Sequence, residues 1–203
     1  MTEPFNPLDI KNLAHSVVTR MEETAPTPLD AIPRFRGAGL YAIYYKGSHP
    51  PYADLSAKNA DNRWEEPIYV GKADPPGGRR GIEVIDHQST TALYSRLRVH
   101  ANSIRAAENL DIADFAARWL VVEDIWIPLG ESAMIRQHQP VWNAIVDGFG
   151  NHNPGAGRIN GVRTRWDTLH PGRAFAPKYP ERSETAADIS QDVREYLRQR
   201  LVP

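Results

Sequence analysis

Arg96 and His100 are a pair of side chains whose types and spacing suit chemistry on a phosphate. They lie four residues apart in a predicted helix, Thr90–Leu110, so both side chains project from one face. A guanidinium binds phosphate oxygens, and an imidazole exchanges a proton near neutral pH. A solvated helix face carrying the same two residues is the alternative that spacing alone leaves open. Apolar residues recur at helical spacing in this segment, at Leu93, Leu97, Ala101 and Ile104.

Glu131 is a carboxylate inside an apolar helix, which is predicted over Asp124–Gln139 and ends before Pro140. A carboxylate on an apolar face is unfavourable unless it is paired or holds a metal ion. Mg²⁺ commonly takes one or two protein oxygens and completes its shell with water and substrate phosphate. The sequence therefore makes Glu131 a candidate Mg²⁺ ligand, and an exposed helical glutamate is the alternative.

Tyr41 and Tyr69 each lie on a short predicted strand close to a glycine, in Gly39-Leu-Tyr41 and Tyr69-Val-Gly71. Strand tyrosines commonly serve only to pack the core, which is the alternative interpretation for both. A neighbouring glycine changes the expectation, because it lets another backbone or a phosphate approach closely.

Composition excludes several classes of protein. The 203 residues contain no cysteine, which excludes a disulfide scaffold, a thiolate zinc site and a cysteine nucleophile. No run of 18 apolar residues occurs and the first residues are polar and acidic, so we expect a cytoplasmic protein. The net charge is −1, yet residues 34–105 hold 11 Lys and Arg against 7 Asp and Glu, and residues 131–180 hold 6 against 3. Such local positive blocks permit a polyanionic partner without requiring one.

The elements that would position these residues alternate between helices and strands, which predicts a small mixed α/β or α+β domain. The stretch Glu23–Arg36 contains three prolines and is predicted to be an extended connector, and Lys46–Glu66 is a polar insertion. Gly148–Gly157 is a glycine-rich loop of a length that is typical of functional loops. Besides the two helices above, the patterns predict helices over Asn6–Met21 and Ile189–Leu201, the latter on the surface, and strands over Gly39–Tyr45, Pro67–Gly71 and Trp119–Glu123.

Taken in order, these residues resemble the signature of the GIY-YIG nucleases. Gly39-Leu-Tyr41 and Tyr69-Val-Gly71 match the paired motif that names the family, and the later elements follow as Arg96, His100, Glu131 and Pro140 with Asn143. The match covers about residues 37–145 and implies a central antiparallel or mixed three-stranded sheet flanked by helices. One departure is the 27 residues that separate Tyr41 from Tyr69, where the family usually has a short turn. The inserted segment could contact DNA, contact a second subunit, or do neither.

The C-terminal part is similar to the GIY-YIG type II restriction endonucleases that cut the palindrome CCGCGG. The similarity rests on Trp142-Asn143, Asp147–His152, Pro154-Gly155, Arg158 and Thr168–Arg173. It implies Mg²⁺ as cofactor, with Mn²⁺ as a possible substitute, and double-stranded DNA as substrate. It also implies a homodimer that cuts one strand per subunit, and a DNA methyltransferase that protects host DNA without being a physical partner. The domain division is then an N-terminal helix and connector (1–36), a nuclease core (37–145) and a C-terminal DNA-contact segment of the same domain (146–203).

The resemblance also implies a role for each residue. Glu131 would hold the metal ion and Arg96 would bind the non-bridging phosphate oxygens. Water deprotonation would fall to Tyr41, Tyr69 or His100, of which Tyr41 is favoured, and a phenol base needs nearby cations because its ordinary pKa is about 10. Lys72 would assist at the DNA, and Asn143 would fix the local backbone or contact DNA. Guanine reading in the major groove would come from the later part of the chain, with Asn151, His152, Arg158, Arg163, Arg165 and Arg173 as candidates.

Two other functions remain compatible with the same residues. One is a monomeric GIY-YIG nuclease of a repair or mobile-element type that nicks a single strand. The other is a DNA-binding regulator that keeps the scaffold without turnover, although the sequence retains every expected catalytic position.

Overall fold

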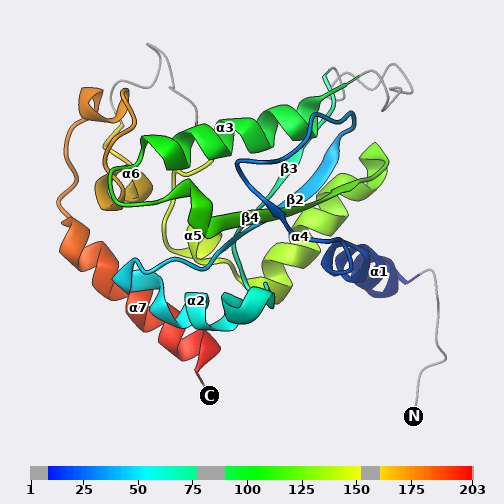
Figure 1. Cartoon of the computed structure of the whole chain (residues 1–203), viewed down its shortest axis with the longest axis horizontal. Helices are drawn as coiled ribbons and strands as arrows, with labels where there is room; N and C mark the ends of the chain where they lie inside the picture. The colour runs from blue at the N-terminus through cyan, green and yellow to red at the C-terminus, as the bar shows by residue number, and fades with distance from the viewer. Residues whose placement is uncertain (1–8, 77–89, 152–160, 203) are drawn as a thin grey trace.

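A central antiparallel sheet organises the chain, which the computed structural model describes over residues 9–76, 90–151 and 161–202. Strand β2 (Gly39–Tyr45) is buried along its whole length and pairs on one side with β3 (Pro67–Ala73) and on the other with β4 (Phe115–Val121). The short strand β1 (Thr27–Pro28) adds to β4, which gives the order β1-β4-β2-β3 within the described residues (Figure 1). The fold is α+β, with β3 at one edge of the sheet.

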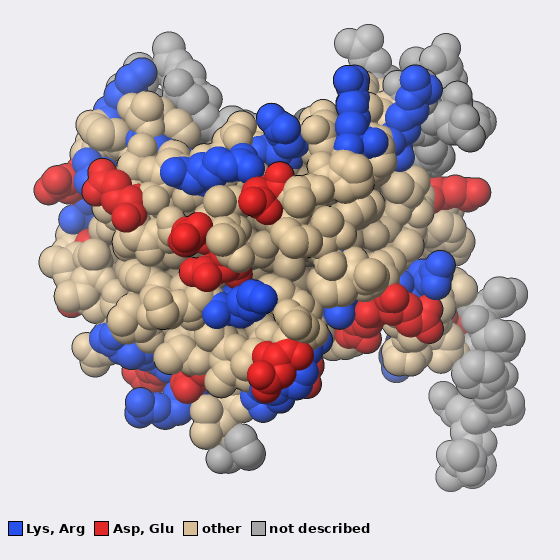
Figure 2. Space-filling view, viewed as in Figure 1, with Lys and Arg blue, Asp and Glu red and all other residues tan. Residues whose placement is uncertain are grey.

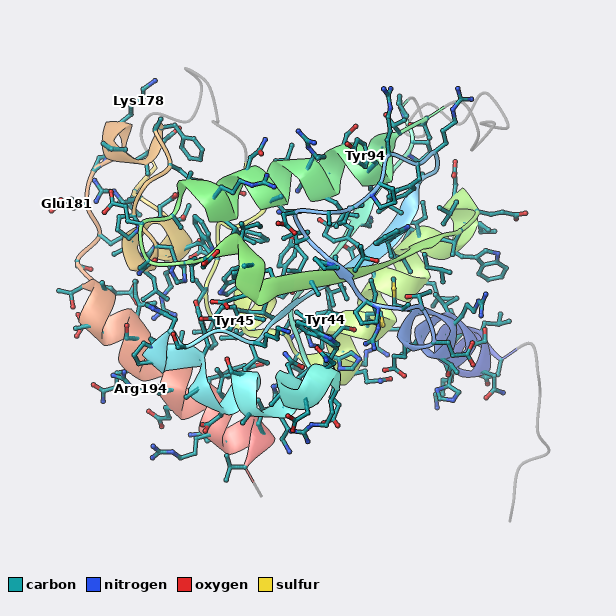
Figure 3. The ribbon with its side chains drawn as sticks, viewed as in Figure 1. Tyr44, Tyr45, Tyr94, Lys178, Glu181 and Arg194 are labelled. Carbon is teal, nitrogen blue, oxygen red and sulfur yellow. The ribbon has the colours of Figure 1, made fainter. Side chains whose placement is uncertain are left out.

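Helices cover both faces of this sheet, because the side chains of β2 alternate between two separate cores. The adjacent residues Tyr44 and Tyr45 belong to opposite cores, and Figure 3 labels both on the central ribbon. The core that contains Tyr45 is covered by α2 (Ala53–Asn59), α3 (Ala92–Ala106), α5 (Val141–Ala144), α6 (Arg165–Leu169) and α7 (Ala186–Leu201). The core that contains Tyr44 is covered by α1 (Ile10–Glu22) and α4 (Ile127–His138). Short 3₁₀ turns span Pro50–Tyr52, Ala60–Asn62, Ile112–Asp114, Asp124–Trp126 and Ala176–Lys178.

All three predicted strands are present, but one of them begins four residues earlier than predicted, and a fourth strand was not predicted. The strand over Gly39–Tyr45 is confirmed, and the next one continues two residues beyond Gly71. The third strand begins at Phe115 rather than Trp119, because the backbone of the alanine-rich start pairs with Tyr44 and Tyr45 although its sequence shows no apolar alternation. The predicted three-stranded sheet has a fourth member, because the proline-rich connector pairs through Thr27 and Pro28.

Helix boundaries follow their capping residues. Helix α1 begins at Ile10 because the Asp9 side chain accepts a hydrogen bond from the backbone N–H of Lys11, and residues 6–8 of the predicted helix lie outside the described part. Helix α4 ends at His138, where Gln139 takes a left-handed conformation with φ of 41° ahead of Pro140. The C-terminal helix is amphipathic: it buries Ile189, Val193, Leu197 and Leu201, while Arg194 is exposed (Figure 3).

The insertion between β2 and β3 folds back onto the C-terminal helix. The Asn59 side-chain amide donates to the backbone carbonyls of Tyr45 and Glu66, at 2.9 and 2.8 Å, and thereby closes the insertion at its base. Arg200 Nη1 of α7 lies 2.9 Å from the Glu66 carboxylate. The insertion therefore leaves the two signature strands adjacent despite its length, as the small entropic cost of long loops allows.

Within the described residues, no helix is long and apolar enough to cross a membrane.

Candidate active site

The two signature tyrosines are brought together by the register of β2 and β3. Tyr41 pairs with Gly71 across the ladder, and Ile43 pairs with Tyr69. A Cβ atom at position 71 would overlap the Tyr41 hydroxyl, so only glycine leaves room for that phenol. The glycine that follows Tyr69 in the motif is therefore required by the other tyrosine of the pair.

His100 of α3 lies against both phenols inside the core. Its Nε2 atom is 2.6 Å from the Tyr41 hydroxyl, and its ring centroid is 5.3 Å from that of Tyr69. Tyr41 and His100 are completely buried. The predicted helix 90–110 thus places its imidazole at hydrogen-bond distance from a signature tyrosine, as a proton-handling pair requires.

A cavity of about 550 Å³ adjoins this pair at the β3 edge, between α3 on one face of the sheet and α4 on the other. We call it the reaction cavity. Residues from β2, β3, α3 and α4 line it, so segments far apart in the sequence share one space. Its lining residues are Tyr41, Tyr69, Lys72, Ala73, Asp74, Ala92, Ser95, Arg96, Val99 and Glu131.

Glu131 reaches the reaction cavity from α4, and its carboxylate is paired with a lysine. Lys72 Nζ lies 3.4 Å from Glu131 Oε2 and 4.0 Å from Asp74 Oδ2. The Glu131 side chain is 25% exposed, so its carboxylate is accessible from the cavity. Leu40 and Val17 pack tightly against Gly130, and this contact fixes the helical turn that carries Glu131.

These residues fit a divalent cation of the Mg²⁺ type in a limited way. Glu131 and Asp74 are oxygen donors that line one open cavity, and Mg²⁺ is typically bound by one or two carboxylates with water and phosphate filling the other positions. The part of the chain that the structure describes holds no cluster of three or more His, Cys, Asp or Glu suited to a metal. Any ion there would rely on substrate oxygens.

Burial acts against ionisation of both phenols. It raises the pKa of Tyr41 well above the usual value, and the neighbouring Tyr69 adds to the shift while the Arg96 guanidinium opposes it. Burial also raises the pKa of Tyr69, again opposed by Arg96. The sequence analysis expected cations to depress the pKa of a phenol base, and here desolvation outweighs Arg96. Both tyrosines are therefore neutral at ordinary pH.

Arg96 and His100 are also held by a loop that the sequence analysis did not connect to them. Arg96 Nη2 donates to the Gly150 carbonyl at 2.9 Å. The Phe149 ring stacks on the His100 imidazole with a centroid distance of 4.5 Å and an interplanar angle of 23°. The glycines around Phe149 were the available signal, because they mark a backbone that approaches another group closely.

Asn143 does not line the reaction cavity. Its side-chain amide makes two hydrogen bonds to the backbone of Val70. Oδ1 accepts from the Val70 N–H and Nδ2 donates to the Val70 carbonyl, both at 2.8 Å. Val70 lies between Tyr69 and Gly71, so Asn143 fixes the β3 backbone beneath the site. This is one of the two roles expected for it.

Arg173 and Arg165 are committed to contacts within the chain. The structure does not support a base-reading role for Arg173, because this residue is only 4% exposed and its guanidinium is bound by Asp167 and by loop carbonyls. Arg165 donates to the Ile145 carbonyl and pairs with Glu184 and Asp192. Both residues therefore support the C-terminal segment from inside.

The other candidate base readers differ in position. Arg163 is partly exposed and lies near Glu181, with 3.7 Å between Nη1 and the carboxylate. Asn151 is exposed at the end of the described loop. His152 and Arg158 lie outside the described residues.

An antiparallel α+β fold whose two central strands each bring a tyrosine to one cavity, beside an arginine and a glutamate from two helices, is that of a GIY-YIG nuclease. A protein-family model for the Eco29kI GIY-YIG domain matches residues 33–197, and the chain belongs to this family of restriction endonucleases. It is a type II restriction endonuclease, a hydrolase that cuts DNA at specific sites. No curated protein matches the chain closely.

Proposed function

We propose that this enzyme uses Mg²⁺ to cut both strands of DNA at a GC-rich palindrome, CCGCGG, as a homodimer with one cut per subunit. The observation that carries the proposal is the reaction cavity, where Tyr41, Tyr69, Arg96 and Glu131 meet from four different elements. Hydrolysis of a phosphodiester needs an activated water, neutralised phosphate charge and a leaving oxygen that can accept a proton. In this cavity Arg96 matches the phosphate charge and Glu131 a cation, and Tyr41 connects the cavity to His100 behind it.

Glu131 is the proposed cation ligand, with Mn²⁺ able to replace Mg²⁺. A bound Mg²⁺ would act as a Lewis acid on the scissile phosphate and stabilise the leaving oxygen. The guanidinium of Arg96 binds the non-bridging oxygens as negative charge builds on them. Lys72 Nζ, 3.4 Å from Glu131 Oε2, pairs with the charge of that carboxylate before the cation arrives and then turns to a DNA phosphate.

Tyr41 and His100 supply the proposed route for the proton of the attacking water. Because burial keeps the Tyr41 phenol neutral, we assign it as a relay rather than a preformed phenolate. The phenol oxygen takes a proton from water while its own proton passes to His100 Nε2, 2.6 Å away. Hydroxide then bonds to phosphorus, and the ester bond breaks with its electron pair on the leaving oxygen. That oxygen takes a proton from solvent water, and the imidazolium of His100 returns its proton to solvent. Tyr69 orients the water or the phosphate.

Sequence reading is assigned to residues of the C-terminal segment. Asn151 and Arg163 stay candidates, together with His152 and Arg158 outside the described residues. Phosphate contacts that position the duplex fall to exposed basic residues such as Arg98 and Arg105 of α3. Figure 2 shows basic side chains gathered over α3, whereas acidic and basic side chains mix at the opposite edge.

The cation assignment is tested by plasmid cleavage with Glu131→Gln. We expect wild-type protein with Mg²⁺ to give discrete fragments whose ends map to CCGCGG. Glu131→Gln should lower the rate by about 10³-fold or more, because the ligand charge is lost while the shape is kept. Glu123→Gln, at an exposed glutamate just before α4, is the matched control and should cut normally. Full activity of Glu131→Gln would contradict the assignment.

The dimer is tested by mass in solution together with the form of the first product. A palindromic target and two-fold symmetry predict a dimer whose first product from a one-site plasmid is mostly linear. A monomer that accumulates nicked circles would instead support the single-strand nuclease alternative. A host that carries this nuclease should also hold a methyltransferase that modifies the same site.

A further inference from the structure

Residues 148–151, the described start of the glycine-rich loop, lie beside the reaction cavity and have their carbonyl groups bound by arginine. Arg173 donates to the carbonyls of Gly148, Phe149 and Asn151 at 3.0, 3.2 and 3.2 Å. The remaining carbonyl of this run, that of Gly150, accepts from Arg96 at 2.9 Å. Four successive carbonyls thus face two guanidinium groups, one inside the core and one in the reaction cavity.

Arg173 is itself fixed from its other side. Nε and Nη2 donate to the two carboxylate oxygens of Asp167 at 2.6 and 2.7 Å, and the two side chains are 3% and 2% exposed. The guanidinium lies over the rings of Trp166 and Phe175, at 4.5 and 4.7 Å from their centroids. The N–H groups of Arg173 therefore all donate to one carboxylate and three carbonyls, and these hydrogen bonds offset the desolvation of a buried ion pair.

The same loop touches the catalytic candidates directly. Phe149 stacks on His100 and meets Tyr69 edge-on at 5.0 Å between ring centroids. A Cβ atom at Gly150 would lie 2.8 Å from the Tyr69 hydroxyl and 3.1 Å from Arg96 Nη2. A larger residue at position 150 would therefore push against the ends of these two side chains.

We propose that Arg173 is a positioning residue, which holds this loop so that Phe149 and Gly150 keep His100 and Arg96 in reactive geometry. None of the hydrogen bonds described for Arg173 reaches a residue of the reaction cavity, so it acts through the loop. The inference rests on the proposed roles of His100 and Arg96. Lysine cannot replace Arg173, because an ammonium lacks the planar fork that spans a carboxylate and several carbonyls.

The test is single-turnover and steady-state cleavage by Arg173→Lys. Because displacement of catalytic groups by about 1 Å lowers the rate by up to roughly 10²-fold, we expect kcat to fall at least about tenfold while KM for DNA stays within about threefold. A folded Arg173→Lys enzyme with wild-type kcat would overturn the proposal, and so would one in which KM rises while kcat is kept.

Arg118→Lys is the matched control. Arg118 also donates to two backbone carbonyls, those of Thr24 and Trp64, at 2.8 and 2.7 Å, and it is partly exposed over the Tyr44 ring of the opposite core. Its variant should lose thermal stability and keep kcat. An equal loss of kcat in Arg118→Lys at matched folded fraction would show that the effect of Arg173→Lys is general destabilisation, and would overturn the proposal.

Phe149→Leu decides the case if Arg173→Lys does not fold, since it keeps an apolar side chain and removes the stacked ring. It should reproduce the selective loss of kcat, and a normal kcat would overturn the proposal. Where both variants fold, the double variant should be no slower than the slower single one, because both act through one loop.

His100→Ala separates the proposed proton route from the positioning role of Arg173. If His100→Ala cuts normally, the proton route fails. If His100→Ala is defective while Phe149→Leu is normal, only the positioning role is refuted.

Discussion

Among the residues that the structure describes, two buried tyrosine–histidine pairs have the same hydrogen-bond distance. In one, the Tyr41 hydroxyl lies 2.6 Å from His100 Nε2, and in the other, the Tyr52 hydroxyl lies 2.6 Å from His170 Nε2. All four side chains are completely buried. Distance and burial therefore cannot tell which pair takes part in chemistry.

The surroundings of the two pairs differ. Trp142 donates its indole N–H to the Tyr52 hydroxyl at 2.8 Å, and His170 Nδ1 lies 2.9 Å from the Asn109 amide oxygen. The second pair is thus satisfied by groups of the chain, among the rings of Trp142 and Trp166. Tyr41 instead borders the reaction cavity together with Arg96. The contrast indicates that an adjoining cavity and a cation, rather than the hydrogen bond itself, make such a pair suitable for catalysis.

The largest expected difference between the pairs is in cleavage rate. Tyr41→Phe removes the hydroxyl of the proposed proton relay and should lower kcat by about 10²-fold or more, as loss of a general acid–base group does. Tyr52→Phe should keep kcat within about threefold per folded molecule. Both are measured by single-turnover cleavage, with the folded fraction determined by circular dichroism. Similar losses in the two variants would remove the distinction drawn here.

A smaller loss of kcat is expected when the Tyr41 hydroxyl is displaced rather than removed. The Cβ atom in Gly71→Ala would press on the Tyr41 hydroxyl and should displace it, which lowers kcat by roughly tenfold or more. Gly47→Ala is the matched control, because its Cβ would crowd the Asp114 carboxylate and the Tyr45 hydroxyl, neither of which lines the reaction cavity. That variant should lose stability and retain its rate. Normal cleavage by Gly71→Ala would show that the position of the phenol matters little.

The free energy of unfolding should depend more on the second pair than on the first, which is the reverse of the order expected for kcat. Tyr52→Phe leaves both the Trp142 indole N–H and His170 Nε2 without their buried partner, so we expect the free energy of unfolding to fall by about 1–3 kcal/mol. Tyr41→Phe should have a smaller effect, since water from the reaction cavity can reach His100 once the hydroxyl is gone. Urea unfolding followed by tryptophan fluorescence measures both. A larger loss in Tyr41→Phe would contradict the assignment of the second pair to structure.

The sequence located the elements that carry the candidate site residues, but it did not reveal the residues that hold those elements in place. Apolar runs and periodicity located β2, β3 and α3, because each buries a regular stripe of side chains. That Glu131 shares a cavity with Arg96 follows from tertiary packing, and only the family resemblance anticipated it. Arg173 was misplaced because a loop arginine after a glycine-rich segment is typical of a DNA contact, and nothing in the spacing reveals Asp167 as its partner. Strand β1 was missed because two residues carry no period.

The smallest expected effect is a pH dependence of stability to which His170 of the second pair contributes. Burial, reinforced by the nearby His49, holds the pKa of His170 well below its ordinary value, while an unfolded histidine titrates near pH 6.5. Below about pH 6.5 the unfolded chain therefore binds more protons at His170 than the folded chain does. The contribution of His170 to the free energy of unfolding is thus fully present above that pH and decreases as pH falls. The decrease is at most about 1.4 kcal/mol per pH unit for this group. We expect His170→Gln to show a shallower decrease in unfolding free energy between pH 7.5 and 5.5 than wild type. His15→Gln, at an exposed histidine of α1, should keep the wild-type slope. Because His49 also has a pKa lowered by burial, part of the slope should persist in His170→Gln, and equal slopes in wild type and His170→Gln would refute the assignment.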